Sequence, residues 1–518
     1  MTTSTPYDET PYPSGPYQQT HPERLEALAR FFGLSAPDIR ACRVLELGAA
    51  DASNLLPMAI AHPESRFVGI DLSQRHVHSG QETIAALSLG NLELLHLDVL
   101  DIDARFGTFD YVIVHGVYSW VPAHVQEHIL EICSANLAPN GVAYVSYNTN
   151  PGWRMRGLLR DMMLYHARKF DDVQMRVDQA RALVQWLAAT VDPEGNPYGM
   201  LLKRELDQMR TWPDAYFRHD SLGEINEPVY FHEFIERAER HGLQYLAEAD
   251  LTQMLASNYA PPIDAALNQM GRDIIELEQY MDFLRNRLFR QTLLCHRGIR
   301  LNRALGAWSL EGFHVASPLQ PAAELDLAPN VSVKFKGPRN LTVSSDDPIV
   351  KAALACLSDV WPRSVHIDEL LRLAKARVPE SLHSESAGDV LGGALLSCCT
   401  KGLCELHVHR SITFVREPSE RPSACPVVRW QAANGDPVTN RRHERVFLDE
   451  LAKRLLPLLD GLRDRAALLQ SMAAWFAEET ITLDEDLPSL EPSRVREALA
   501  RKLEHALGLY GRQALLVS

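Results

Sequence analysis

Three carboxylates stand at or beside the ends of short apolar runs in the N-terminal part of the chain: Glu46, Asp71 and Asp98. Apolar runs separated by amphipathic stretches are typical of the parallel strands of an open α/β sheet, which binds ligands in the crevice beyond the carboxyl ends of its strands. A carboxylate there can accept hydrogen bonds from an amino group, from ribose hydroxyls or from an adenine amine. The three positions together predict a site for a small ligand that carries such donors.

The turn after the first run indicates a ligand without a pyrophosphate. Glu46 is followed two positions later by Gly48, which lets the backbone approach a ligand closely. Ala50 and Ala52 stand where a dinucleotide-binding turn has its second and third glycines, and a pyrophosphate needs backbone amides at very close range. The alanines therefore weaken a nicotinamide-cofactor interpretation. Glu46 is predicted to meet the amino group of an amino-acid moiety, directly or through a water.

Asp71 and Asp98 each have two interpretations. Asp71 can accept from both ribose hydroxyls, or it can cap the helix that begins near Ser73, although Ser73 is itself the better cap. Asp98 can accept from an adenine amine, or it can be a solvated loop aspartate. We favour ligand binding for both, and we expect their neighbours Leu72 and Val99 to contact the same ligand.

Aromatic and amide side chains follow the next two apolar runs. Tyr118 and Trp120 stand just after the fourth run and are predicted to line the channel through which a nucleophile enters, unless both rings pack under a neighbouring helix. Tyr147 and Asn148 end the fifth run and face the same crevice. They are predicted to align the nucleophile, with ordinary loop hydrogen bonding as the alternative.

These positions require an alternating order of strands and helices. Helical patterns at about 54–61, 74–88 and 122–136 separate the runs, which implies right-handed crossovers and a parallel sheet covered on both faces. The five predicted strands are Arg43–Leu47, Arg66–Asp71, Leu92–Leu97, Tyr111–His115 and Val142–Tyr147. Asn140-Gly141 indicates a turn just before the fifth strand.

The sheet is predicted to resume after a helical insertion at 152–215. Leu243–Ala247 and Gln291–His296 are the expected sixth and seventh strands. The helix pattern before the seventh strand carries Asp282, Arg285 and Arg287, which we interpret as helix-surface or interdomain salt-bridge partners rather than site residues. The alternative to a resumed sheet is a five-stranded domain followed by a separate helical one.

The rest of the chain indicates further domains. Helix patterns from 348 to 401 precede a predicted strand pair, Leu403–His407 and Ser411–Val415, which is the order of a winged helix. The tail from 442 to 518 is mostly helical in pattern. The predicted fold class is α/β, a seven-stranded Rossmann-like sheet with a helical insertion, plus α+β and winged-helix-like C-terminal domains. The predicted domains span 1–151, 152–215, 216–300, 301–415 and 416–518.

Composition excludes several classes of function. The 518 residues carry a formal net charge of −15, which disfavours nucleic acid as a partner and is compatible with a cationic, lysine-bearing one. The basic cluster 440–443 is too short to indicate nucleic acid. The eight cysteines include no Cys-x-x-Cys pair, so neither a disulfide framework nor a metal site is predicted. We find no membrane span and no signal-peptide pattern, and we expect a cytoplasmic protein.

The chain resembles class I S-adenosylmethionine-dependent methyltransferases in three motifs: Glu46-Leu47-Gly48, Gly69-Ile70-Asp71-Leu72-Ser73 and Leu97-Asp98-Val99. A narrower resemblance covers most of the chain and involves bacterial methyltransferases with a "methyltransferase regulatory domain", including rickettsial protein-lysine methyltransferases of outer-membrane proteins. Its motifs are Tyr7-Asp8-Glu9, Pro11-Tyr12, Thr20-His21-Pro22, the segment 115–122 and the segment 279–287.

This resemblance implies an S-adenosylmethionine site, a dimerising helical insertion and further C-terminal domains. It also favours folding of the N-terminal aromatic arm, Tyr7, Tyr12 and Tyr17, over the cofactor, where the alternative is a partly disordered tail. The expected cofactor-binding residues are Tyr17, His21, Glu46, Gly48, Ala50, Asn54, Asp71, Leu72, Asp98, Val99, His115 and Gly116.

Three functions remain open at the level of sequence. The first is a methyltransferase for protein lysines, with an outer-membrane or surface protein before export as one candidate substrate. The extensive C-terminal half favours this function, because a small substrate needs no recognition surface of that size. The second is a methyltransferase for a small molecule, natural-product or lipid-linked. The third is a non-enzymatic regulator that senses the cofactor. The Asn/Asp-Pro-Pro-Tyr signature of amide- and base-amino methyltransferases is absent.

Overall fold

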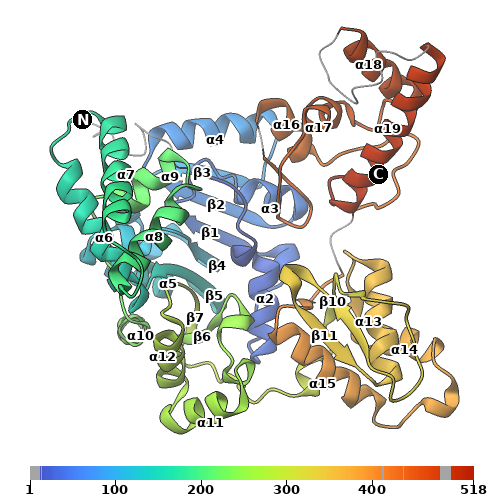
Figure 1. Cartoon of the computed structure of the whole chain (residues 1–518), viewed down its shortest axis with the longest axis horizontal. Coiled ribbons are helices and arrows are strands. Elements are labelled where there is room, and N and C mark those ends of the chain that lie inside the picture. The colour runs from blue at the N-terminus through green and yellow to red at the C-terminus, as the bar shows by residue number, and fades with distance from the viewer. Residues whose placement is uncertain (1–11, 13, 411–413, 436, 479–491) are drawn as a thin grey trace.

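The computed structural model describes residues 12, 14–410, 414–435, 437–478 and 492–518. A seven-stranded sheet with the order β3-β2-β1-β4-β5-β7-β6 forms its centre (Figure 1). Strands β1 to β5 run parallel, and β7 is antiparallel to both of its neighbours. The strands are β1 Arg43–Leu47, β2 Arg66–Asp71, β3 Leu92–His96, β4 Phe109–Val114, β5 Leu137–Asn148, β6 Leu243–Glu248 and β7 Phe289–His296.

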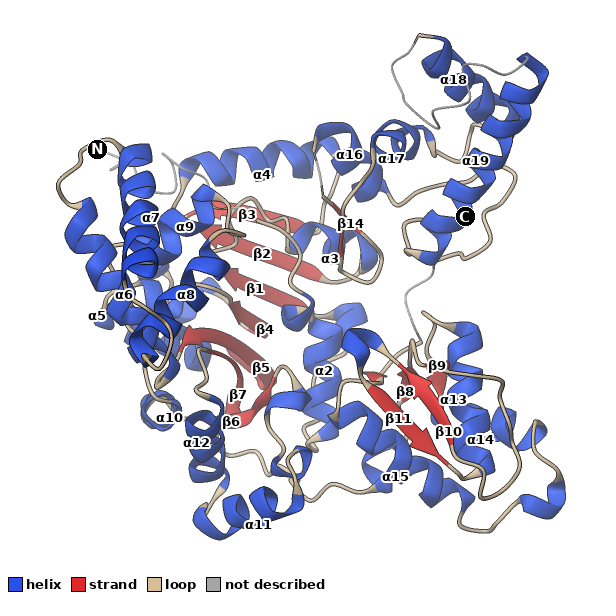
Figure 2. Ribbon diagram, in the orientation of Figure 1, coloured by secondary structure: helices blue, strands red, loops and turns tan. Residues whose placement is uncertain are grey.

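Helices cover this sheet, which explains the apolar character of its strands (Figure 2). The predicted fold class is confirmed, and β1 and β2 begin and end where their apolar runs do. Strand β5 begins earlier than predicted, because the Asn140-Gly141 signal lies within the strand, where the pairing with β4 shifts register. The helices of this unit are α2 Pro22–Phe31, α3 Leu55–Ala61, α4 Gln74–Ala86, α5 Ala123–Ala135, α10 Phe231–Arg240, α11 Pro261–Met270 and α12 Ile274–Arg285.

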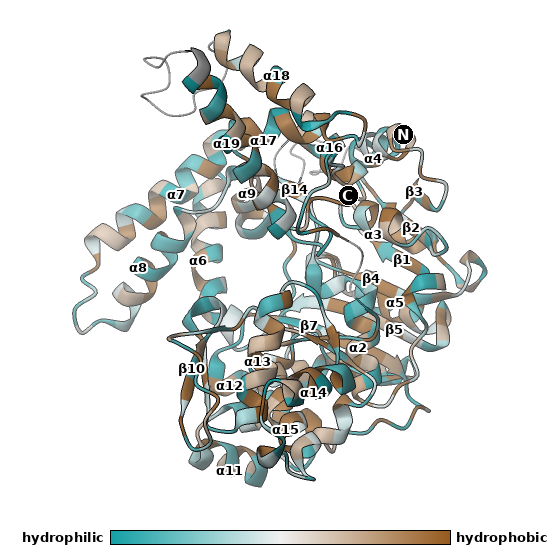
Figure 3. Ribbon diagram, turned by 90° about the vertical axis from the view of Figure 1, so that its right-hand side faces the viewer, coloured by the Kyte–Doolittle hydropathy of each residue, from teal (hydrophilic) through white to brown (hydrophobic). Residues whose placement is uncertain are grey.

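The insertion between β5 and β6 is helical, as predicted. It has a hydrophobic core of its own, and two of its helices, α7 and α8, project from the body of the molecule (Figure 3). Its last helix begins just before the predicted boundary at 215 and continues to 222, so the helical stretch is longer than expected. The helices are α6 Gly152–Ala167, α7 Val173–Thr190, α8 Pro197–Met209 and α9 Asp214–Leu222.

The segment that follows the sheet packs against α2 and shares its hydrophobic core. The predicted hairpin is not what the described residues show: β13 pairs with β8, which precedes the three helices, and residues 411–413 lie outside the described part. The elements are β8 His314–Ala316, β9 Gln320–Pro321, β10 Val333–Lys336, β11 Thr342–Ser345, α13 Pro348–Val360, β12 Val365–His366, α14 Ile367–Ala376, α15 Ala387–Thr400 and β13 Glu405–His407.

The last segment has a separate core and packs its first helix, α16, against α3 at the sheet (Figure 1). Strands β14 and β15 form a short antiparallel pair. Its elements are α16 Pro426–Asn434, β14 Val438–Thr439, β15 Arg445–Val446, α17 Glu450–Leu455, α18 Arg465–Ala477 and α19 Pro492–Arg512. Among the described residues, none of the helices has the length and apolar character that crossing a membrane requires.

Candidate active site

A buried carboxylate with one free oxygen lies at the end of β1. Glu46 is 3% exposed, and its Oε1 accepts a hydrogen bond of 2.8 Å from Asn54 Nδ2. Its Oε2 is buried and has no hydrogen-bond partner among the residues that the structure describes. Burial raises the pKa of Glu46 to about 8, the bond from Asn54 lowers it, and the nearby charges of Asp71 and Asp51 raise it further. Such a carboxylate suits a cationic donor, because an ammonium group would supply both the missing hydrogen bond and the compensating charge.

The turn after β1 keeps a glycine-type backbone despite its alanines. Gly48 has a φ of +74°, and a side chain there would place its Cβ 2.5 Å from Val117 Cγ2. Ala50 and Ala52 also have positive φ, 48° and 61°. This region costs free energy for any residue with a Cβ. The turn therefore has the close-approach shape that the motif predicts, and it reaches that shape at an energetic cost.

Asp71, at the end of β2, accepts hydrogen bonds from the main chain. Its Oδ2 accepts from Ala50 N and its Oδ1 from Ser73 N, both at 2.8 Å. The cap of α4 is Ser73, whose hydroxyl accepts from His76 N at 3.2 Å. Burial raises the pKa of Asp71. Each carboxylate oxygen has further acceptor capacity, so these bonds orient Asp71 for a ligand hydroxyl without occupying it fully.

Exposed leucines follow the ends of β2 and β3. Asp98 follows β3 and accepts from Leu100 N at 3.0 Å, so it caps the short 3-10 helix Val99–Asp101. Leu72 and Leu100 are exposed, at 50% and 44%. Exposed leucines beside two carboxylates offer an apolar surface together with acceptors, which is the combination that an adenine base uses.

The N-terminal arm crosses the site. The ring of Tyr17 lies 4.1 Å from the ring of His115, centroid to centroid, and Tyr17 N donates to Asn54 Oδ1 at 2.9 Å. Burial lowers the pKa of His115 to about 4, so the imidazole is neutral. Its Nδ1 lies 3.0 Å from the hydroxyl of Tyr144. Gly116 N donates to Ser146 Oγ at 2.8 Å. Of the arm's other tyrosines, Tyr12 packs near α9, and Tyr7 lies outside the described residues.

His21 caps the helix that follows the N-terminal arm. Its Nδ1 accepts from Glu23 N at 3.3 Å and thereby caps α2. Its ring lies 5.0 Å from that of His443, in an edge-on arrangement. Burial lowers the pKa of His21. The structure therefore gives His21 a neutral, helix-capping position beside His443.

The aromatic residues predicted to line the nucleophile channel, or in the case of Tyr147 to align the nucleophile, separate into two groups. Tyr118 is 0% exposed and Tyr147 is 1% exposed, and both rings pack on Phe234 in the core. A ring with no exposed surface does not line a channel in this conformation, so the packing alternative describes Tyr118. Trp120 is half-buried and meets the ring of Trp153 at 6.2 Å, where α6 leaves the sheet.

Asn148 makes hydrogen bonds to side chains of the surrounding segments. Its main-chain N–H donates to Ser119 Oγ, and its Nδ2 donates to Asn226 Oδ1, both at 2.8 Å. Asn226 lies in the loop between α9 and α10. Asn148 is 5% exposed. Its contacts match the hydrogen-bonding alternative, and alignment of a nucleophile by Asn148 stays a prediction.

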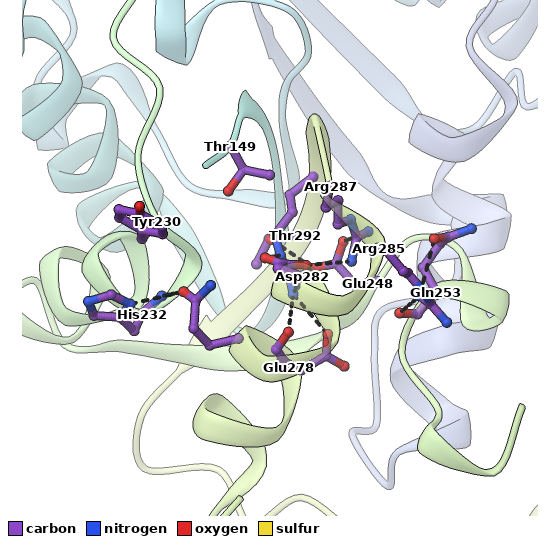
Figure 4. Close-up of polar contacts among 12 residues, drawn as sticks. Thr149, Tyr230, His232, Glu248, Gln253, Glu278, Asp282, Arg285, Arg287 and Thr292 are labelled. Carbon is purple, nitrogen blue, oxygen red and sulfur yellow. Dashed lines mark hydrogen bonds and ion pairs between the residues drawn. The ribbon is translucent and has the colours of Figure 1, made fainter. Parts of the chain in front are cut away.

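A buried ionic cluster supports the same edge of the sheet (Figure 4). Arg290 on β7 is fully buried and ion-pairs with Glu248 and Asp282 at 2.8 Å and with Glu278 at 3.0 Å. Arg287 bonds the second oxygen of Glu248 at 2.8 Å. Because a buried charge left unpaired is costly, these pairs tie α12 to β6 and β7. Asp282 and Arg287 are salt-bridge partners, as predicted, but Asp282 is buried and does not lie on the helix surface. Arg285, predicted with them, donates to the main-chain oxygen of Gln253.

Sequence reasoning missed one contact of the site, which comes from the C-terminal segment. His443 Nε2 lies 2.8 Å from Asn54 Oδ1, a residue 389 positions away in the chain. The cluster 440–443 was a visible signal, since it is basic in an acidic chain. Composition gave no reason to connect it with the sheet, because a contact of this range leaves no periodicity in the sequence.

Three family models match the chain. A "Methyltransferase domain" matches residues 45–143, a "Predicted methyltransferase regulatory domain" matches 213–296, and a "PKMT, C-terminal winged helix domain" matches 420–515. The winged helix model therefore lies after the segment whose helix order had indicated such a domain. The first match contains the ends of β1, β2 and β3 that carry the carboxylates.

Similar proteins extend over nearly the whole chain. An uncharacterized protein of Rickettsia prowazekii (strain Madrid E) is 35% identical over 509 residues, which are 96% of this chain and 90% of that protein. Two solved structures of PKMT2 from Rickettsia typhi, one of them in complex with AdoHcy, each cover 98% of this chain and 100% of their own, with 29% identity and a TM-score of 0.88. The likeness thus includes the sheet, the insertion and the C-terminal segments together.

Proposed function

Because the chain belongs to the family of S-adenosylmethionine-dependent methyltransferases that carry a methyltransferase regulatory domain, we propose that it methylates lysine side chains of a protein substrate. The observation that carries the proposal is the whole-length likeness to PKMT2, whose abbreviation stands for protein-lysine methyltransferase. Small-molecule methyltransferases need no recognition surface as large as the segments after β7. A protein substrate is also compatible with the net charge of −15, since lysine-bearing segments are cationic.

The cofactor of this enzyme is S-adenosylmethionine, and the residues at the strand ends fit it. The free buried oxygen of Glu46 suits the amino group, and the oriented carboxylate of Asp71 suits the ribose. Asp98, with the exposed Leu72 and Leu100, suits the adenine. When bound, S-adenosylmethionine supplies a methyl group that is attached to a positively charged sulfur. Loss of the methyl group leaves this sulfur as a neutral thioether. The protein therefore needs to bind, orient and exclude water rather than to form a covalent bond.

A lysine nucleophile must lose its proton before it can accept a methyl group. Its ordinary pKa of about 10.4 makes the neutral amine scarce near neutral pH. An apolar aromatic wall lowers that pKa, because it disfavours the charged form. Trp120 and the arm's Tyr17 are aromatic side chains near these strand ends that keep some exposure, and we assign this role to them. The neutral His115 beside Tyr17 adds no competing positive charge.

Labelling tests the proposal. The purified chain is incubated with methyl-labelled S-adenosylmethionine and a lysate of its host, and protein bands and extractable small molecules are counted separately. We expect label in protein. Label confined to small molecules would instead support the small-molecule function, and a cofactor-binding protein that transfers no label would support the regulatory one.

Two matched variants give the labelling its control. Asp71→Asn keeps the size of the side chain but removes its charge and one acceptor, and should weaken cofactor binding about tenfold, with loss of label at limiting cofactor. Asp346→Asn changes an exposed aspartate far along the chain and should leave both unchanged. Equal labelling by both variants under those conditions would contradict the assignment of Asp71.

A further inference from the structure

Asn54 connects the cofactor site with the C-terminal segment, and all of its hydrogen bonds are made. Tyr17 N donates to its Oδ1 at 2.9 Å. Because a main-chain N–H can only donate, the atom facing it is the oxygen, and the amide nitrogen faces the other way. That nitrogen donates to Glu46 Oε1 at 2.8 Å and to Thr20 Oγ1 at 3.0 Å. The orientation of the Asn54 amide therefore directs which oxygen of Glu46 remains free.

His443 provides the second bond to the same oxygen. Its Nε2 lies 2.8 Å from Asn54 Oδ1, and since that oxygen only accepts, the histidine must carry its proton on Nε2. His443 is 5% exposed. Burial also lowers its pKa well below the ordinary value, which keeps the ring neutral. A neutral donor is what this position needs, because a cation there would compete with the cofactor's amino group for Glu46.

The turn that presents His443 is built for that position. His443 has a φ of 60°, in the left-handed region that costs free energy for a residue with a Cβ. Asn440 holds the turn: its Oδ1 accepts from Arg442 N and from Glu444 N, both at 2.9 Å. Its Nδ2 donates to Gln513 O at 2.9 Å, which anchors the turn to the end of α19.

The same turn holds the N-terminal arm. Gln18 Nε2 donates to Arg442 O at 3.1 Å and to Glu444 Oε1 at 3.2 Å. The guanidinium of Arg445 lies 5.8 Å from the centre of the Tyr17 ring. A side chain at Gly15 would place its Cβ 2.4 Å from that guanidinium, so the arm and the turn are in close contact there. The arm is thus held between the sheet and the C-terminal segment.

We infer that the turn 440–445 is a positioning element of the cofactor site, and that His443 acts through Asn54 to hold Glu46 for the cofactor's amino group. This inference goes beyond the proposed lysine substrate and rests only on the cofactor. It gives the C-terminal winged helix segment a role at the catalytic sheet. His443 is a positioning residue, because it contacts Asn54 and not the carboxylate that receives the ligand.

Calorimetry with two ligands tests the inference on the full-length chain. S-adenosylhomocysteine has the amino-acid end that Glu46 would hold, and 5′-methylthioadenosine lacks it. His443→Leu keeps the bulk and removes the donor, and should weaken S-adenosylhomocysteine about five- to tenfold while leaving 5′-methylthioadenosine unchanged. His443→Gln keeps a neutral donor and should restore most of the affinity. Both variants bear the same left-handed backbone, so strain cancels between them.

Three results would overturn the inference. One is wild-type affinity for S-adenosylhomocysteine in His443→Leu, and another is an equal loss for both ligands, which is what general disruption of the arm would cause. The third is an equal loss in the control His505→Ala, which changes an exposed histidine of the same segment. Melting temperatures of the ligand-free variants identify any that do not fold. If His443→Leu does not fold, His443→Ala replaces it, because alanine leaves space instead of adding a branched side chain.

Discussion

At the scale of the residue, Glu46 determines how the site responds to pH. Its pKa of about 8 exceeds the ordinary 4.5, so the ligand-free native state keeps a proton that the unfolded chain has lost. This contribution to stability is complete below pH 4.5 and is lost as the pH rises towards 8. Binding of a cation has the opposite dependence, because it requires the ionised carboxylate.

We therefore expect S-adenosylhomocysteine to bind more tightly as the pH rises from about 6 to about 8, by up to about tenfold per pH unit. Calorimetry across this range measures the slope. Glu46→Gln cannot ionise and should bind weakly with a much flatter dependence. If the variant kept the slope of the wild type, another group would be responsible and the role of Glu46 would be refuted.

How far single residues could be predicted depended on whether their role leaves a local pattern. The positions of Glu46 and Asp71 at the ends of β1 and β2 could be predicted from their apolar runs, and their ligand roles stay predictions that rest on the relation between strand ends and the ligand crevice. The burial of Tyr118 could not be predicted, because an aromatic residue after a strand has the same pattern whether it faces the crevice or the core. The left-handed Ala50 was also hidden, since alanine rarely adopts that conformation.

At the scale of the element, the short 3-10 helix Tyr118–Trp120 carries Trp120, which we still propose as a wall of the nucleophile channel. We expect Trp120→Ala to reduce turnover by an order of magnitude or more, roughly the effect of losing a well-placed wall. Cofactor affinity and melting temperature should be nearly unchanged. Trp308→Ala, at a tryptophan that is 55% exposed elsewhere, is the matched control. A variant that melts several degrees earlier but turns over normally would show that Trp120 belongs to the core.

The helical insertion is proposed to make a homodimer. Some of the insertion's apolar residues, such as Leu159 and Val184, are buried in its own core. Others stay exposed: Leu158 at 48%, Trp186 at 61% and Met200 at 61%. Exposed apolar side chains on projecting helices are typical of surfaces that a second copy covers.

Light scattering at micromolar concentration measures the oligomeric state. We expect a dimer for the wild type and a shift to monomer for Trp186→Glu, since a charge is costly in an apolar interface. Lys203→Glu, on an exposed face of α8, introduces the same charge without removing an apolar contact and should stay dimeric. A monomeric wild type would remove the proposal.

The elements themselves were largely predictable, because hydrophobic periodicity reports burial directly. The resumed sheet was found from two apolar runs, 243–247 and 291–296, that follow the helical insertion. The pairing of β13 with β8, a strand some ninety positions earlier, was not predicted, and most of the strand predicted to pair with it lies outside the described residues. Hydrophobic periodicity indicates whether a segment is a helix or a strand, but it does not indicate which strand pairs with which.

At the scale of the whole molecule, we propose the five-domain division with boundaries near 151, 215, 300 and 415, with the insertion continuing through α9. The contact of His443 with Asn54 supports a closed arrangement in which the last domain completes the first. We also propose that methylation takes place in the cytoplasm, before export of a surface protein. Such relations between distant segments could not be predicted from one sequence, since only the fold brings them together.

Mass spectrometry of the methylated proteins tests the central claim most directly. The purified chain is incubated with labelled S-adenosylmethionine and host lysate, the labelled proteins are digested, and the modified residues are mapped. We predict methyl groups on lysine side chains, reduced up to about tenfold when Asp71→Asn replaces the wild type at limiting cofactor. Methyl groups on other residue types, or label found only outside proteins, would contradict the assignment of this chain as a protein-lysine methyltransferase.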